Sequence, residues 1–138
     1  MSPTPTTPAS TRFAERVFRI AAIYGILVLL PQYFMEERIG RDFPPAITHP
    51  EHFYGFVGVA LAWQVVFLII AKDPVRYRPI MLAAILEKLA FGGAALALFL
   101  AHRLATSVLA AGVVDLVLAG LFLAAYRRTG EGGRRLGD

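Results

Sequence analysis

The chain has 138 residues, of which 57% are hydrophobic and 17% are charged, and its mean hydropathy is +0.57. Soluble domains contain about 25% charged residues, so this composition excludes an ordinary soluble globule and predicts a membrane protein. The absence of cysteine excludes disulfides, thiolate nucleophiles and cysteine-based metal sites, and the formal net charge is +4.

Residues 1–12 are rich in Pro, Thr and Ser, which predicts a disordered cytoplasmic tail. Four apolar blocks follow it, at residues 17–34, 53–71, 80–101 and 105–126. Each has the length of one bilayer crossing, because about 20 helical residues span the hydrocarbon core. We therefore expect an all-α fold, a membrane-embedded bundle of four transmembrane helices within residues 13–128. An outer loop at 36–52 and a flexible cytoplasmic tail at 129–138 complete the expected organisation.

The first apolar block has a signal peptide as its alternative interpretation, since Arg12 and Arg16 precede it and Arg19 lies near its start. No small-residue cleavage motif follows the block, and the chain continues into Pro31 and Gln32. We therefore expect an uncleaved membrane anchor.

The basic residues indicate the orientation of the four expected spans. One side carries only Arg38, Arg41 and Arg103, and Lys88 falls within a span. The other side carries Arg12, Arg16, Arg19, Lys72, Arg76, Arg78, Arg127, Arg128, Arg134 and Arg135. The positive-inside rule then places both termini in the cytoplasm. The excess of Arg over Lys and the abundant Ala are typical of GC-rich bacteria, so we expect the bacterial inner membrane. Contact with lipid headgroups accounts for the positive charge, and we expect no nucleic-acid partner.

Apart from Arg19 near the start of the first span, three charged residues lie within the expected spans: Glu87, Lys88 and Asp115. Such groups cost about 2.5–3.5 kcal/mol each on insertion scales, so they need an explanation. If the chain turns back near residue 75, Trp63 and Gln64 come level with Glu87 and Lys88. The first span brings Tyr24 to the same depth, whereas Asp115 is expected about 7.5 Å further out.

Two interpretations of this polar layer stay open. In the functional one, the layer lines a ligand site in which carboxylates hold a proton or a cationic ligand. The candidate ligand-binding residues are Glu87, Lys88, Asp115, Gln64, Trp63 and Tyr24. In the structural one, Glu87 hydrogen-bonds to Gln64 across helices, and Lys88 extends to the cytoplasmic headgroups.

The last two blocks contain Gly92, Gly93, Gly112 and Gly120 together with many alanines. Small residues allow close helix packing in lipid, which predicts a tight hairpin of these two helices. A hinge at Gly92 and Gly93, as in transporters, is the alternative.

The end of the outer loop carries His49, Glu51 and His52. A His/His/carboxylate group suggests a metal or haem site. Thr48 and Glu51 also match a capping box at the start of the second span, with Pro50 in its first turn. We favour the capping interpretation, so we expect neither a metal site nor a cofactor, and His49 and His52 stay weak metal candidates.

Resemblance to known proteins rests on three stretches, ITHPEHFYGFVGVALAWQ, AKDPVRYRP and LEKLAFG. They look like segments of a group of small bacterial four-span membrane proteins with no assigned activity, and the likeness extends from Tyr33 to Arg128. It implies a four-helix fold and no particular chemistry. In size and architecture alone, the chain also resembles DoxX-like proteins and sterol-isomerase-like proteins related to the emopamil-binding protein. The latter resemblance implies that Glu87 and Asp115 would act on a hydrophobic amine or a sterol.

Motifs for nucleotide binding, serine hydrolysis or zinc hydrolysis are not found, which disfavours an enzyme. We expect an accessory or scaffold protein, or a protein that binds a hydrophobic small ligand through the buried polar layer. The alternatives are an intramembrane enzyme of sterol-isomerase-like type and a small transporter or channel subunit, both using Glu87 and Asp115. The expected partners are membrane lipids, further copies of the chain, or a larger membrane complex.

Overall fold

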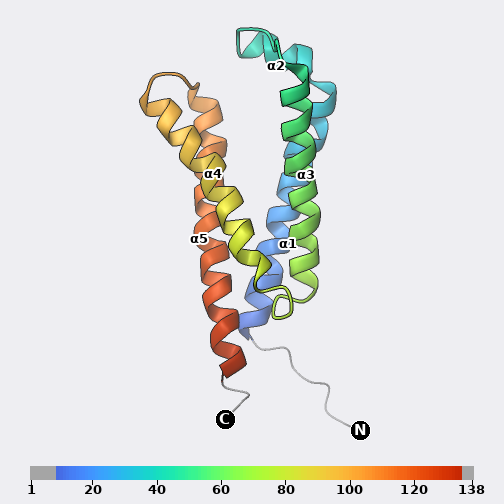
Figure 1. Ribbon diagram of the computed structural model, residues 1–138, viewed down its shortest axis with the longest axis vertical. Helices are drawn as coiled ribbons and strands as arrows, with labels where there is room; N and C mark the ends of the chain where they lie inside the picture. The colour runs from blue at the N-terminus through green and yellow to red at the C-terminus, as the bar shows by residue number, and fades with distance from the viewer. Residues whose placement is uncertain (1–8, 135–138) are drawn as a thin grey trace.

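The computed structural model describes residues 9–134, and the regular structure in this range is entirely helical (Figure 1). The elements in chain order are α1 (Ala9–Leu29), the 3₁₀-helix η1 (Leu30–Phe34), α2 (Glu36–Asp42), α3 (Pro50–Lys72), α4 (Ile80–Leu100) and α5 (Thr106–Arg134). This confirms the all-α fold class.

Three helices in the described part of the chain are long and apolar enough to cross a membrane. They are Pro50–Lys72, Ile80–Leu100 and Thr106–Gly130. Their apolar side chains are largely exposed, as expected where lipid surrounds a protein. These helices agree with the multi-pass membrane protein that the composition predicts.

Helix α1 differs from the predicted first span at both ends. It begins at Ala9, inside the predicted disordered tail, whose residues 1–8 lie outside the described range. It ends at Leu29, and Pro31 lies near the start of the tighter η1 turn. Every 18-residue stretch of α1 therefore includes Arg12, Arg16 and Arg19, so α1 is not among the apolar spans.

Other predicted boundaries also shift. Helix α3 begins at Pro50 rather than 53, because proline suits the first turn of a helix. The predicted outer loop contains the short helix α2. Helix α5 continues to Arg134, into the predicted flexible tail, whose last residues, 135–138, lie outside the described range.

The helices are arranged as two antiparallel pairs. Helix α1 packs mainly on α3, and α4 packs mainly on α5. Contacts between α1 and α5 join the pairs at the end near the chain termini, and the pairs diverge toward α2 (Figure 1). This splayed arrangement is more open than the single compact bundle that the apolar blocks predict.

An aromatic cluster closes the joined end. Phe18 of α1 stacks on Phe122 of α5 with ring centroids 4.2 Å apart, and Phe67 of α3 meets Phe122 edge-on at 5.0 Å. All three side chains are fully buried. Van der Waals packing is the main attraction between helices in lipid, so this cluster is where the two pairs are held together.

Close packing of α4 on α5 confirms the predicted hairpin. A Cβ added to Gly92 would lie 2.9 Å from the carbonyl oxygen of Gly112, and a Cβ added to Gly112 would lie 2.5 Å from Ala95 Cβ. Helix α4 runs without interruption through Gly92 and Gly93, so the hinge alternative is wrong for this structure. Gly93 and Gly120 face open space within the described residues, so they do not take part in this contact.

Candidate functional site: a polar cluster in an apolar cleft

A cleft of about 520 Å³ lies between the two helix pairs, in their diverging part. The walls of the cleft are mainly apolar. The residues that line it come from α1, η1, α2, α3, α4 and α5 and from the two residues that flank α2. These residues include Val28, Leu29, Met35, Ile39, Phe43, Phe56, Phe91 and Val108. The volume falls within the range of about 300–1,000 Å³ that is typical of small-molecule sites.

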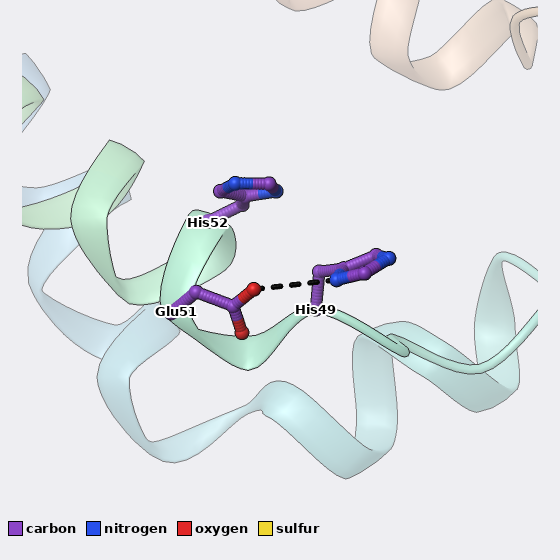
Figure 2. A group of neighbouring side chains, drawn as sticks. All are labelled: His49, Glu51 and His52. Carbon is purple, nitrogen blue, oxygen red and sulfur yellow. Dashed lines mark hydrogen bonds and ion pairs between the residues drawn. The ribbon is translucent and has the colours of Figure 1, made fainter.

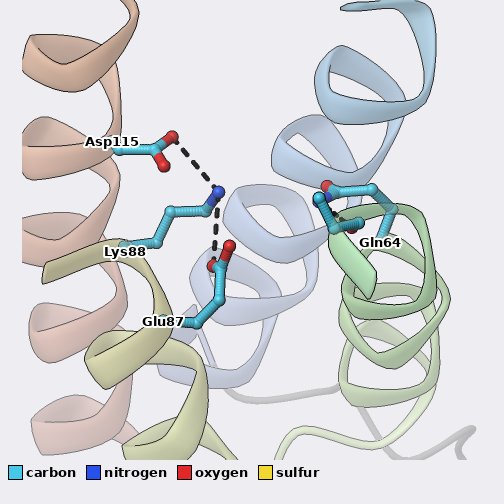
Figure 3. A network of polar contacts seen from close by, with 5 residues as sticks. Gln64, Glu87, Lys88 and Asp115 are labelled. Carbon is cyan, nitrogen blue, oxygen red and sulfur yellow. Dashed lines mark hydrogen bonds and ion pairs between the residues drawn. The ribbon is translucent and has the colours of Figure 1, made fainter. Parts of the chain in front are cut away.

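Polar side chains gather at the end of the cleft that lies next to the aromatic cluster (Figure 3). Lys88 Nζ of α4 donates a hydrogen bond of 3.1 Å to Asp115 Oδ1 of α5. The same ammonium lies 3.3 Å from Glu87 Oε2, which has no hydrogen-bond partner of suitable geometry among the described residues. Lys88 is 6% exposed and Asp115 is 9% exposed. The lysine therefore serves as counter-charge to both carboxylates.

Gln64 of α3 faces this cluster from the other helix pair (Figure 3). Its Nε2 donates to the Ala60 carbonyl oxygen at 2.9 Å, while its Oε1 has no hydrogen-bond partner in residues 9–134. The side chain fits against α1 because Gly25 has no Cβ, which would collide with the Gln64 amide. Gln64 is only 1% exposed, and an unpaired buried carbonyl is costly.

The cluster carries an excess of negative charge when all three groups are ionised. Two carboxylates share one ammonium group. Two buried atoms, Gln64 Oε1 and Glu87 Oε2, have no hydrogen-bond partner within residues 9–134, and both are acceptors. Glu87 Oε2 is paired with Lys88 by charge alone. Both atoms are enclosed, so a hydrogen-bond donor that enters the cleft would reach them once the Gln64 and Glu87 side chains turn toward it, and it would then satisfy both acceptors.

Five of the six candidate ligand-binding residues line the cleft: Tyr24, Gln64, Glu87, Lys88 and Asp115. The sixth, Trp63, is half-buried and packs against the hydrophobic core, with its ring 6.2 Å from that of Phe67. Adjacent residues on a helix point about 100° apart. Gln64 is turned toward the cleft, whereas Trp63 is turned toward the core.

Two expectations from the structural interpretation are wrong. Lys88 binds Asp115 and Glu87 instead of extending to headgroups. Gln64 donates to the backbone of its own helix instead of to Glu87. Asp115, expected about 7.5 Å further out than Lys88, accepts a hydrogen bond from it, because the long lysine side chain can span that difference in depth.

The apolar walls of the cleft were not predicted as site residues. Phe56, Phe91 and Val108 look like any lipid-facing residue in the sequence, and no local pattern distinguishes them. One signal was available in the sequence: Met35, Ile39 and Phe43 are apolar residues in a segment otherwise rich in charge, which indicates that they face the rest of the folded protein.

The start of α3 holds the second group of candidate residues, His49, Glu51 and His52 (Figure 2). The N-cap residue of α3 is His49, and no side-chain hydrogen bond caps the helix. The capping box of Thr48 and Glu51 is therefore wrong. Glu51 Oε1 instead lies 3.2 Å from His49 Nδ1.

Comparison of the chain with protein-family models, with functionally characterised proteins and with experimentally determined structures found no match.

Proposed function

We propose that the protein is a small integral membrane protein of the bacterial inner membrane that binds a hydrophobic small molecule in the cleft. The observation that carries this proposal is the combination of an apolar cleft of about 520 Å³ with a buried polar end, in which two carboxylates share one ammonium group and two acceptor atoms have no hydrogen-bond partner among the described residues. An apolar ligand body would lie against the walls. Its polar head, a protonated amine or a hydroxyl group, would donate to Glu87 and Gln64.

The geometry favours binding over conduction. The polar end of the cleft abuts the aromatic cluster of Phe18, Phe67 and Phe122, with Lys88 Nζ 5.5 Å from the centre of the Phe67 ring. A pore would have to continue through these buried rings. An isomerase-like enzyme would use the same carboxylates, so chemical conversion of a bound ligand is the outcome that would distinguish it.

Native mass spectrometry in mild detergent tests the proposal with three probes of equal chain length: dodecylamine, dodecanol and dodecanoate. We expect dodecylamine to bind best, dodecanol more weakly and dodecanoate least, because the cluster has two carboxylates for one ammonium group and is therefore anionic. Glu87→Gln removes one negative charge at the cleft and should weaken dodecylamine binding about tenfold or more, which corresponds to one lost charge-assisted hydrogen bond.

Glu15→Gln is the matched control, because it makes the same chemical change at a residue of α1 that does not line the cleft. It should bind dodecylamine like the wild type. Equal binding of all three probes, or equal losses in the two variants, would contradict the proposed head-group recognition.

The proposed topology has four spans, with α1 crossing the membrane beside α3 and both termini in the cytoplasm. It is supported by the lateral packing of α1 on α3 and by the apolar side chains that α1 exposes, such as Ile20 and Leu27. Reporter tags at the two termini test this number of spans. Both tags should be cytoplasmic; tags on opposite sides would show that α1 does not cross.

A further inference from the structure

Three donor side chains converge at the start of α3, away from the cleft (Figure 2). One ligand atom from each of His49, Glu51 and His52 lies within 4.8 Å of the others. All three residues are exposed to solvent. The cluster therefore lies on the surface of the protein, within reach of a dissolved ion.

The local sequence explains why these side chains meet. Pro50 occupies the first turn of α3 and disfavours a helical backbone at the residue before it. His49 accordingly has φ −125° and ψ 73°, outside the helical region. Its ring lies 5.4 Å, centre to centre, from that of His52, and its Nδ1 lies 3.2 Å from Glu51 Oε1.

Ordinary structural roles do not account for this cluster. The three side chains are exposed, so they are not part of the packed core. No side chain of the cluster hydrogen-bonds to the backbone at the start of α3. The polar contact that the structure gives within the group is the one between His49 and Glu51.

The spacing of the donor atoms is close to that of a tetrahedral metal site. Metal–ligand distances of about 2.0–2.1 Å place neighbouring tetrahedral ligands about 3.3 Å apart. The 3.2 Å separation of His49 Nδ1 and Glu51 Oε1 already matches one such edge. The third donor, on the exposed His52 side chain, lies within 4.8 Å of the other two.

The donor set indicates the class of metal. Two imidazoles and one carboxylate suit Zn²⁺ and neighbouring divalent transition metals, and two His with one Glu is a ligand set found at zinc sites. The Glu51 carboxylate also offsets the partial positive charge of the helix N-terminus, which by itself disfavours a cation.

We propose that His49, Glu51 and His52 bind a divalent transition metal such as Zn²⁺ at the end of α3. Three protein ligands leave a fourth coordination position for water or for a group from a partner. This site is separate from the cleft and does not depend on the function proposed for it.

Isothermal titration with Zn²⁺ tests the site on the full chain, purified in detergent without a polyhistidine tag. We expect one Zn²⁺ per chain. Loss of residues that only support metal ligands costs about 10–100-fold in affinity, so His49→Ala and His52→Ala should each weaken binding at least about tenfold. Both residues are exposed, and unchanged helicity by circular dichroism would show that the variants fold.

His102→Ala provides the matched control, since His102 is an exposed histidine in the turn between α4 and α5 and is not part of the cluster. This variant should bind Zn²⁺ like the wild type. The proposal would be overturned if the wild type failed to bind Zn²⁺. It would also be overturned if His49→Ala and His52→Ala bound Zn²⁺ with wild-type affinity, or if His102→Ala lost as much affinity as they do.

Discussion

Replacement of Lys88 by methionine is the most informative test of the polar cluster. Methionine has a similar length but no charge, so Lys88→Met leaves Glu87 and Asp115 buried without their counter-charge. At the 3.1 Å separation of Lys88 and Asp115, the Coulomb energy is about 5 kcal/mol for an effective dielectric constant of about 20. Desolvation of both groups offsets much of this energy in the folded protein.

The net cost of Lys88→Met should nevertheless be about 3–5 kcal/mol, the range found when one partner of a buried ion pair is removed. Asp115→Asn should cost less, about 1–3 kcal/mol, because Lys88 keeps Glu87 at 3.3 Å. In the double variant the two losses should not add, and a coupling energy of about 1–3 kcal/mol is expected. Lys88→Met should therefore cost more free energy of unfolding than Asp115→Asn, because one lysine is paired with two carboxylates.

Unfolding by a denaturing detergent in mixed micelles, followed by circular dichroism, measures these free energies. Leu86→Met on the same helix is the control, because Leu86 is 67% exposed and lies outside the cluster. A cost for Lys88→Met that is equal to or smaller than that for Asp115→Asn, or additive losses in the double variant, would refute the shared counter-charge.

Two further predictions concern the contact of α4 with α5 and the hydrogen bond that joins α2 to α3. Gly92→Ala should destabilise the protein by about 1–3 kcal/mol, since the new methyl group meets Gly112 O at 2.9 Å. The neighbouring Gly93→Ala, whose methyl group faces open space among the described residues, should be neutral or slightly stabilising in the same assay. Equal effects would contradict the close contact of α4 and α5. Tyr54→Phe removes the 2.7 Å hydrogen bond from Tyr54 OH to Glu36 Oε2, so amide exchange in α2 should become faster while that of α4 stays the same. Unchanged exchange in α2 would show that this bond does not anchor it.

The position of the candidate site could be predicted in part. Counting residues from the turn near residue 75 places Gln64 level with Glu87 and Lys88, and all three line the cleft. The same counting also selected Trp63, because depth in the membrane says nothing about the direction in which a side chain points. The rotation of α3 about its axis, set by packing on α1, decides that Gln64 faces the cleft and Trp63 the core.

The amino-acid sequence by itself determines that this is a helical protein with segments long and apolar enough to span a membrane, because runs of apolar residues of bilayer length are a local property of the chain. It also determines the close α4–α5 hairpin, since Gly92 and Gly112 permit an approach that larger side chains prevent. Only the tertiary structure decided that the helix pairs diverge, that Lys88 bridges to Asp115, and that a cleft opens above them. Those features depend on how helices distant in sequence tilt and rotate against one another, and hydrophobic patterning leaves tilt and rotation undetermined.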